Sequence, residues 1–182
     1  GWIFYGFRTI KFPSFFMSEP MYSIRPIQSQ DNAQIAKIIR EVSAEFGLAA
    51  ESGFAVGDSI LDNLYEVYQQ RNAAYWVIVD EQDQVFGGGG IAPLEGDQSI
   101  LEIQKMYFLP IIRRYGFAKQ ILNLAFDFAH EQNFKRIYLE TTASLWQAVK
   151  LYEKSGFEHL DHPEGNTGHS AACEIWMLKT LD

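Results

Sequence analysis

Cysteine and positive charge are both scarce in this chain of 182 residues. Cys173 is the only cysteine, which excludes an intrachain disulfide and favours a reducing compartment, so we expect a cytoplasmic protein. Fifteen lysines and arginines face 23 aspartates and glutamates, and the resulting net charge of -8 repels nucleic acid and anionic membranes. We therefore expect neither nucleic acid nor a membrane as a partner.

Two common phosphate-binding motifs are also missing. The sequence contains no GxxxxGK[ST] string, and its four consecutive glycines, Gly87 to Gly90, lie between apolar residues in a strand-like run instead of opening a helix. Nucleotide hydrolysis and dinucleotide binding are therefore disfavoured.

A metal site is not expected either. Four potential ligands gather near the end of the chain, but their spacing matches no zinc pattern and Cys173 begins an apolar run. These ligands are His159, His162, His169 and Cys173.

The beginning of the chain, GWIFYGFRTIKFPSFF, is aromatic, but it lacks the long apolar core and the small-residue cleavage site of a signal peptide. We expect residues 1–20 to be an extension that is disordered or foreign to the native protein. The alternative is an ordered aromatic arm that covers a hydrophobic surface or a partner subunit, in a domain that serves protein interaction.

Hydrophobic periodicity predicts strands and helices along residues 21–182, which we expect to form a single domain. A helix ending near Phe46 is expected to be capped by Ser29 or Asp31. Further helices are expected at 60–68, 118–132 and 146–155, and strands at 22–27, 75–80, 85–94, 100–109, 136–141 and 172–178. This order indicates a mixed α/β fold.

The most informative segment runs from Met106 to Lys119 and reads MYFLPIIRRYGFAK. An apolar strand ends at a proline and is followed by Arg113-x-x-Gly116-x-Ala118 at the start of a helix. Free amides at a helix start attract phosphate, and the small residues leave room for it to approach. The segment therefore predicts a polyphosphate ligand.

This segment resembles the acetyl-CoA signature (Q/R)-x-x-G-x-(G/A) of the GNAT N-acetyltransferase family. A second block, YLET at 138–141 followed by AVKLYEKSGF at 148–157, resembles the family's fifth strand and its A-x-x-x-Y-x-x-x-G-F helix. The resemblance covers roughly residues 22–181. It implies a mixed, mostly antiparallel central sheet of six to seven strands flanked by about four helices.

The resemblance also implies acetyl-CoA as the acyl donor. The backbone of Met106, Tyr107 and Phe108 is implied to bind the pantetheine arm or the thioester oxygen, because the family's fourth strand bulges there. The loop that follows is implied to bind the pyrophosphate through its amides, with added charge from Arg113. That loop comprises Arg113, Arg114, Tyr115, Gly116, Phe117, Ala118 and Lys119.

Acetyl transfer to an amine requires a base, and it requires an acid for the departing thiolate. Glu102 resembles the family's general base, which often acts through water, and Tyr152 occupies the position of a general acid. Plain structural readings stay open: Glu102 could form an ion pair at a strand edge, and Tyr152 could be a packing residue with one hydrogen bond.

Three positions depart from the family pattern. Arg114 and Leu145 stand where glycine and asparagine are common, and Ile111-Ile112 where an acidic residue is common. If the loop requires a positive φ at position 114, arginine is strained there. Leu145 cannot make the side-chain hydrogen bond that asparagine would make near CoA.

The sequence thus predicts an acetyl-CoA-dependent N-acetyltransferase that acts by direct attack on a primary amine of a small molecule or peptide, and it leaves room for a homodimer. The alternative is a non-catalytic acyl-CoA-binding or regulatory module. Glu102 and Tyr152 facing an open cleft would favour the enzyme, whereas a closed cleft would favour the module.

Overall fold

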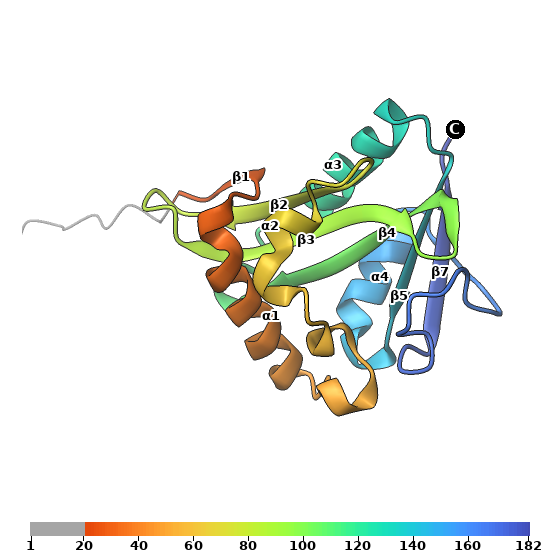
Figure 1. Cartoon of the computed structure of the whole chain (residues 1–182), viewed down its shortest axis with the longest axis horizontal. Helices are drawn as coiled ribbons and strands as arrows, with labels where there is room; N and C mark the ends of the chain where they lie inside the picture. The colour runs from red at the N-terminus through yellow and green to blue at the C-terminus, as the bar shows by residue number, and fades with distance from the viewer. Residues whose placement is uncertain (1–20) are drawn as a thin grey trace, which may run out of the picture.

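The computed structural model describes residues 21–182, shown in colour in Figure 1. The predictions made for residues 1–20, including an aromatic arm, lie outside the described residues. In the described part, seven strands form one sheet in the order β1-β2-β3-β4-β5-β7-β6. The strands are β1 (Ser23–Pro26), β2 (Ala74–Val79), β3 (Val85–Leu94), β4 (Asp97–Phe108), β5 (Arg136–Thr141), β6 (Glu158–His159) and β7 (Ile175–Thr180).

Neighbouring strands are antiparallel throughout the described sheet, except for the parallel pair β4 and β5. Four α-helices complete this part of the chain, so the predicted fold class is confirmed. The helices are α1 (Asn32–Glu45), α2 (Leu64–Val67), α3 (Phe117–Glu131) and α4 (Trp146–Lys154).

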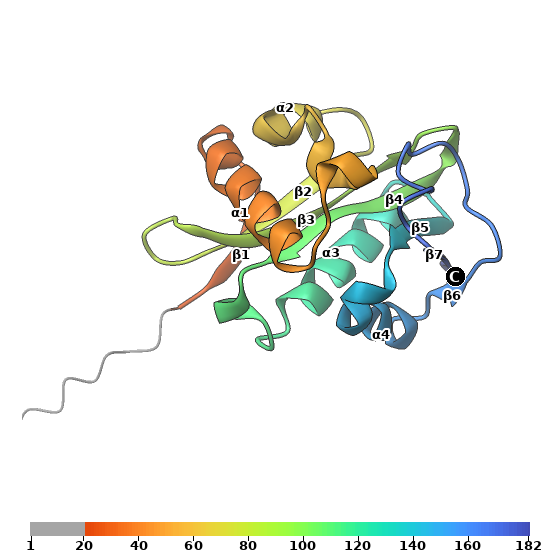
Figure 2. The same cartoon turned by 90° about the horizontal axis from the view of Figure 1, so that it is seen from below.

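The helices cover both faces of the sheet, with α1 and α2 on one face and α3 and α4 on the other (Figure 2). Alternation along β2 explains this layering, since successive strand residues point to opposite faces. Tyr75 and Val77 pack in the core beneath α1 and α2, whereas Ile78 packs with Ile121 of α3. The sheet therefore has an apolar core on each face.

Some element boundaries differ from the prediction. The last strand begins at Ile175, because the residues before it form a turn in which Cys173 N donates to His169 O at 3.1 Å. The predicted helix over 60–68 is broken into a 3-10 turn, Leu61–Asn63, and the short α2. Strand β6 has only two residues, too few to show a periodic pattern.

The Gly87–Gly90 run lies within β3, as its apolar neighbours predicted. A Cβ at Gly90 would lie 2.5 Å from the Tyr75 ring and 2.8 Å from the Tyr68 ring, and a Cβ at Gly89 would lie 2.5 Å from Met106 Cγ. The glycines therefore make room for side chains that lie flat on the strand.

Strand β4 carries a β-bulge before its end. Gly88 pairs with Tyr107 and Gly90 with Gln104, so β4 has one more residue than β3 in this interval. Lys105 sits in the bulge with φ of 50°, and its carbonyl accepts a hydrogen bond from Tyr75 OH at 2.8 Å. The bulge lies where the family resemblance implied one.

Strands β4 and β5 stay together only briefly. Their register contains two pairs, Leu101 with Ile137 and Glu102 with Tyr138. Beyond Glu102, β4 and β5 form no further paired residues with each other. This divergence opens the middle of the sheet.

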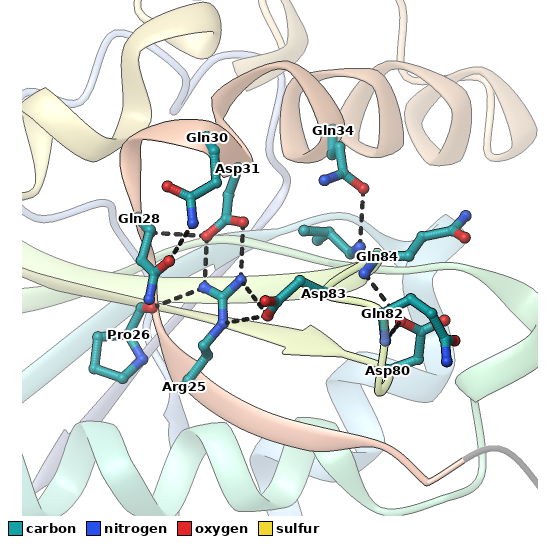
Figure 3. Close-up of polar contacts among 11 residues, drawn as sticks. Arg25, Pro26, Gln28, Gln30, Asp31, Gln34, Asp80, Gln82, Asp83 and Gln84 are labelled. Atoms are coloured by element: carbon teal, nitrogen blue, oxygen red, sulfur yellow. Dashed lines mark hydrogen bonds and ion pairs between the residues drawn. The ribbon is translucent and has the colours of Figure 1, made fainter.

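Asp31 anchors the start of α1 in a way that differs from the expected cap (Figure 3). Its side chain makes no cap bond to α1. It is fully buried and pairs with Arg25, with 2.7 Å from Arg25 Nη1 to Asp31 Oδ2, and it also accepts from Gln28 N at 2.8 Å. Arg25 in turn contacts Asp83 in the β2–β3 turn at 3.1 Å. The carboxylate thus joins β1, α1 and this turn.

Candidate active site

A groove of about 560 Å³ runs from the end of β4 to the starts of α3 and α4. Its walls contain nine of the ten residues predicted to bind acetyl-CoA, and Tyr115 is the exception. Those nine are Met106, Tyr107, Phe108, Arg113, Arg114, Gly116, Phe117, Ala118 and Lys119. The structure thus brings the predicted cofactor residues to one groove.

The first turn of α3 offers free amides to this groove. The first backbone bond into the helix runs from Gln120 N to Gly116 O at 3.1 Å. Among the described residues, the amides of Phe117, Ala118 and Lys119 have no hydrogen-bond acceptor, and the first turn contains no acidic side chain. Unpaired amides and the helix dipole together favour an anion.

Two loop residues have left-handed backbone conformations. Gly116 is the N-cap of α3 with φ of 81°, and a Cβ there would meet nothing within 4 Å. Arg114 has a φ of 79°, so the loop does require a positive φ where the family commonly has glycine, and the arginine backbone is strained there.

Arg113 is held by protein groups. Its guanidinium makes two bonds of 2.6 Å to the Glu45 carboxylate at the end of α1, and its Nε donates to Phe108 O at 2.9 Å. The hydrogen bond and charge of Arg113 lower the pKa of Glu45. Arg113 therefore ties the loop to α1 and to the end of β4, so part of its charge is already matched.

A second cavity of about 380 Å³ lies between the diverging strands and the segments 48–60 and 167–173. It meets the first groove at a shared wall made by Met106, Tyr107, Leu145 and Tyr152. The family resemblance implies that residues 47–58 and 161–170 shape the acceptor pocket, and both regions contribute to the lining of this cavity although neither carries a diagnostic motif. The groove and the second cavity therefore share one junction.

Glu102 lines the second cavity, at the last residue where β4 and β5 pair. It is 8% exposed, and Gln104 Nε2 donates to its Oε2 at 2.6 Å. Burial raises the pKa of Glu102 to about 7, against the lowering effect of the Gln104 bond. A carboxyl group with this pKa exchanges a proton readily near neutrality, and no ion pair holds it at a strand edge in the described structure.

Tyr152 lies on the shared wall, on the buried side of α4. Its ring packs edge-on against Phe157 at 5.8 Å, and among the described residues its hydroxyl has no hydrogen-bond partner. Burial raises the pKa of Tyr152, so the phenol keeps its proton at neutral pH.

Cys173 also lines the second cavity, but it is a poor nucleophile. Burial, together with the charges of Glu140, Glu174 and Glu102, raises the pKa of Cys173 to about 12. A thiol with this pKa contains little thiolate at neutral pH.

A charged cluster closes one side of the cavity. Lys105 Nζ lies 2.8 Å from Asp58 Oδ2, and His169 Nε2 lies 3.2 Å from Asp58 Oδ1. His169 Nδ1 lies 2.9 Å from Gly53 O, so both ring nitrogens face acceptors, as in an imidazolium. The hydrogen bonds with Asp58 and Gly53 raise the pKa of His169. Through His169, the cluster connects the 167–173 segment to the 53–58 segment.

Glu140 on β5 supplies a further carboxylate to the cavity. Three hydroxyl groups donate to it: Tyr138 OH and Thr167 Oγ1 at 2.8 Å, and Ser170 Oγ at 2.6 Å. These bonds fix the position of the carboxylate.

Sequence reasoning missed several residues of this cavity. Lys105 and Gln104 received no role, and Asp58 and His169 were included only as members of the regions 47–58 and 161–170, with His169 also among the rejected zinc ligands. The Glu102–Gln104 pair did carry a signal, because polar residues two apart on a strand share a face. The Asp58–Lys105 contact joins positions far apart in the chain and left no local pattern.

Comparison with known proteins gives the family. The model of the Acetyltransferase (GNAT) family matches residues 40–157. Uncharacterized N-acetyltransferase YjgM of Escherichia coli (strain K12) is 54% identical over 159 residues, which cover 87% of this chain and 94% of that protein. N-acetyltransferase 8 of Homo sapiens is 27% identical over 111 residues, covering 59% of this chain and 44% of its own length.

Solved structures share the fold. An acetyltransferase of the GNAT family from Staphylococcus aureus Mu50 aligns with a TM-score of 0.74 at 18% identity, over 89% of this chain and 100% of that one. Spermidine N-acetyltransferase from Vibrio cholerae, in complex with CoA and spermine, aligns with a TM-score of 0.61 at 22% identity, over 87% and 95%.

The chain belongs to the GNAT acetyltransferase family, as its two sequence motifs predicted. It is an N-acetyltransferase, like the relatives that it matches. Glu102 lines the second cavity, and Tyr152 lies on the wall that this cavity shares with the groove.

Residues 21–182 contain no helix that is both long and apolar enough to cross a membrane. In the same range, no group of three or more histidine, cysteine, aspartate or glutamate side chains is placed to hold a metal ion.

Proposed function

We propose that the protein transfers an acetyl group from acetyl-CoA to a primary amine of a small molecule or peptide by direct attack. The observation that carries this proposal is the wall shared by the groove and the second cavity, at Met106, Tyr107, Leu145 and Tyr152. A donor in the groove and an acceptor in the cavity would meet there, which supplies the proximity that a bimolecular reaction needs.

The residues of the groove suit the donor. The free amides of the first turn of α3 would hold the pyrophosphate, and the open space at Gly116 leaves room for it. The unpaired edge of β4 after Glu102 would face the pantetheine arm. When bound, acetyl-CoA supplies the acetyl thioester. Arg113 positions the loop, and Arg114 and Lys119 add positive charge.

Glu102 and Tyr152 divide the proton transfers. Glu102 would accept the proton that the amine loses as its nitrogen bonds to the acetyl carbon, directly or through water. Tyr152 would donate its hydroxyl proton to the sulfur as the carbon–sulfur bond breaks. The buried phenol keeps its proton for this step, and Glu102 near its pKa can take one up.

Acetyl-CoA binding is tested by calorimetry on Gly116→Glu. We expect binding in the micromolar range for the wild type and its loss in the variant, since the new carboxylate would project into the phosphate site. Gly168→Glu is the matched control: Gly168 also has a positive φ, 77°, and open space around it, but it does not line the groove. Absent binding by folded wild-type protein would refute the donor assignment.

The general base is tested with Glu102→Gln. A panel of polyamines, amino acids and lysine-containing peptides, assayed by acetyl-CoA consumption, provides the acceptor. The variant is expected to lose about 10²- to 10⁴-fold in kcat while its acetyl-CoA affinity stays unchanged, because it removes a proton acceptor and leaves the groove intact. Wild-type turnover by Glu102→Gln would exclude this carboxylate as the base.

The predicted homodimer and the expected lack of nucleic-acid and membrane partners stay predictions from the sequence. Sedimentation analysis tests the first of them.

A further inference from the structure

Glu102 belongs to a chain of three hydrogen-bonded side chains that leads away from the cavity. Tyr68 OH donates to Gln104 Oε1 at 2.8 Å, and Gln104 Nε2 donates to Glu102 Oε2 at 2.6 Å. Among the described residues, Gln104 is the only side chain that donates to Glu102, and Oε1 of Glu102 accepts no hydrogen bond. One carboxylate oxygen is therefore fixed, and the other is left for the acceptor.

The local sequence explains how the chain of side chains forms. Glu102 and Gln104 are two residues apart on β4, so both point to the same face of the sheet. Tyr68 follows α2 directly and is 3% exposed. Its ring packs on Tyr75 at 5.0 Å and lies over Gly90, where a Cβ would come within 2.8 Å of it. Because Gly90 has no side chain, the Tyr68 ring fits over β3 and its hydroxyl reaches Gln104.

We propose that Gln104 is a positioning residue for the general base, and that Tyr68 fixes the orientation of the Gln104 amide. The inference rests on the proposed role of Glu102. A hydroxyl that donates to the amide oxygen turns the amide NH₂ toward the carboxylate. The opposite orientation would set the amide oxygen against an ionised carboxylate, which is unfavourable.

The hydrogen bond from Gln104 affects the pKa of Glu102 and therefore its capacity to accept a proton. Burial penalises the charged form of Glu102, whereas a donated hydrogen bond stabilises it, and the Gln104 bond is the largest of the effects that lower its pKa. The other titratable groups that interact electrostatically with Glu102 lie on β4, on β5, after α2 and in the 167–173 segment. They are Glu140, Lys105, His169, Tyr68, Tyr138 and Cys173.

Gln104→Met tests the inference, because methionine has a similar length and no donor. The readout is a ¹³C NMR titration of carboxyl-labelled glutamate, with the Glu102 signal assigned from its loss in Glu102→Gln. We expect a wild-type midpoint at about 7 and an upward shift of about one pH unit in Gln104→Met. With an acceptor from the amine panel, the acidic limb of kcat/KM should move in the same direction.

Tyr68→Phe is a second, independent variant. It removes the hydroxyl that orients the amide but keeps the amide itself, so the midpoint is expected to rise by a smaller amount. Tyr65→Phe, three residues earlier in α2, is its matched control, since among the described residues the Tyr65 hydroxyl makes no hydrogen bond. This control is expected to titrate like the wild type.

Acetyl-CoA affinity serves as the check on folding, because neither Gln104 nor Tyr68 lines the donor groove. An unshifted midpoint in Gln104→Met or Tyr68→Phe protein that binds acetyl-CoA normally would overturn the inference. That result would leave the base assignment standing. Wild-type turnover by Glu102→Gln is the separate result that removes the base, and with it the catalytic meaning of Gln104.

Discussion

Arg114 occupies a backbone conformation that residues with a Cβ adopt at a cost. Its φ of 79° lies in the left-handed region, and it stands two residues before Gly116, which shares that conformation. Its side chain is exposed and lines the donor groove. The position therefore combines backbone strain with a positive charge facing the expected phosphate.

Arg114→Gly is expected to raise the free energy of unfolding by about 1 kcal/mol, because glycine adopts this φ freely. The gain is partly offset by the greater freedom of glycine in the unfolded chain. Urea unfolding monitored by circular dichroism measures it. Arg114→Lys keeps the Cβ and should match the wild type, and a destabilised Arg114→Gly protein would show that strain does not dominate at this position.

At the scale of single residues, the motif predicted a set of residues that the structure gathers in one groove, whereas most side chains of the second cavity carried no motif. The donor loop is contiguous, so its residues and their order already indicate free amides at a helix start. Asp58 pairs with Lys105, and Gln104 accepts from Tyr68, and both of these contacts join positions distant in sequence. Tyr68, for example, reaches Gln104 only because α2 packs over β3 and β4.

Among the elements, α1 is held at both ends by ion pairs of different kinds. Asp31 at its start is fully buried against Arg25, whereas Glu45 at its end pairs with Arg113 in a more exposed place. The exposed pair is expected to contribute little stability and to position the loop. Removing one partner of the buried pair would leave an uncompensated charge.

Asp31→Ala is expected to cost about 3–5 kcal/mol of unfolding free energy, because it leaves Arg25 without its buried partner. Asp83→Ala provides the comparison: its side chain is 70% exposed and contacts the same guanidinium, so its loss should cost at most about 1 kcal/mol. Chemical denaturation of both variants measures the difference. Equal costs would mean that burial does not set the strength of the Arg25 contacts.

The elements also show where local patterns stop being informative. Asp31 precedes α1, as a capping residue would, and that placement predicted the helix start. Its side chain turns away to Arg25 and to Gln28 N, because a nearby guanidinium attracts a carboxylate more strongly than one amide does. No pattern within the helix sequence indicates that choice.

For the molecule as a whole, the divergence of β4 and β5 brings two cavities to one wall. Direct transfer requires both substrates to be bound together, and Cys173 is a poor carrier of the acetyl group because of its raised pKa. The arrangement therefore favours a ternary complex.

Initial-rate measurements with both substrates varied are expected to give intersecting double-reciprocal lines. Cys173→Ala should turn over within about twofold of the wild type, because a nucleophile role would instead cost orders of magnitude. Parallel lines, together with an acetylated Cys173 in mass spectra, would overturn direct transfer.

The fold was predictable because strand and helix periods extend through most of residues 21–182, and because two ordered motifs fixed the family. The family resemblance indicated which regions border the second cavity, but its individual side chains were not predictable, since segments 48–60 and 167–173 come together only after folding. Neither segment has a regular period of its own.

The run Gly87–Gly90 of β3 limits which substitutions these four positions can tolerate. An added methyl group would come within 2.7 Å of Tyr107 O at Gly87, 2.6 Å of Trp76 O at Gly88 and 2.9 Å of Ala74 O at Gly90, and backbone oxygens have little room to yield. A saturation mutagenesis screen should find these positions among the least tolerant in the chain, although none of them lines either cavity. In such a screen, these glycines of β3 would therefore be as intolerant of substitution as the proposed reacting residues. Measuring acetyl-CoA binding as well as activity would distinguish the structural positions from the reacting ones.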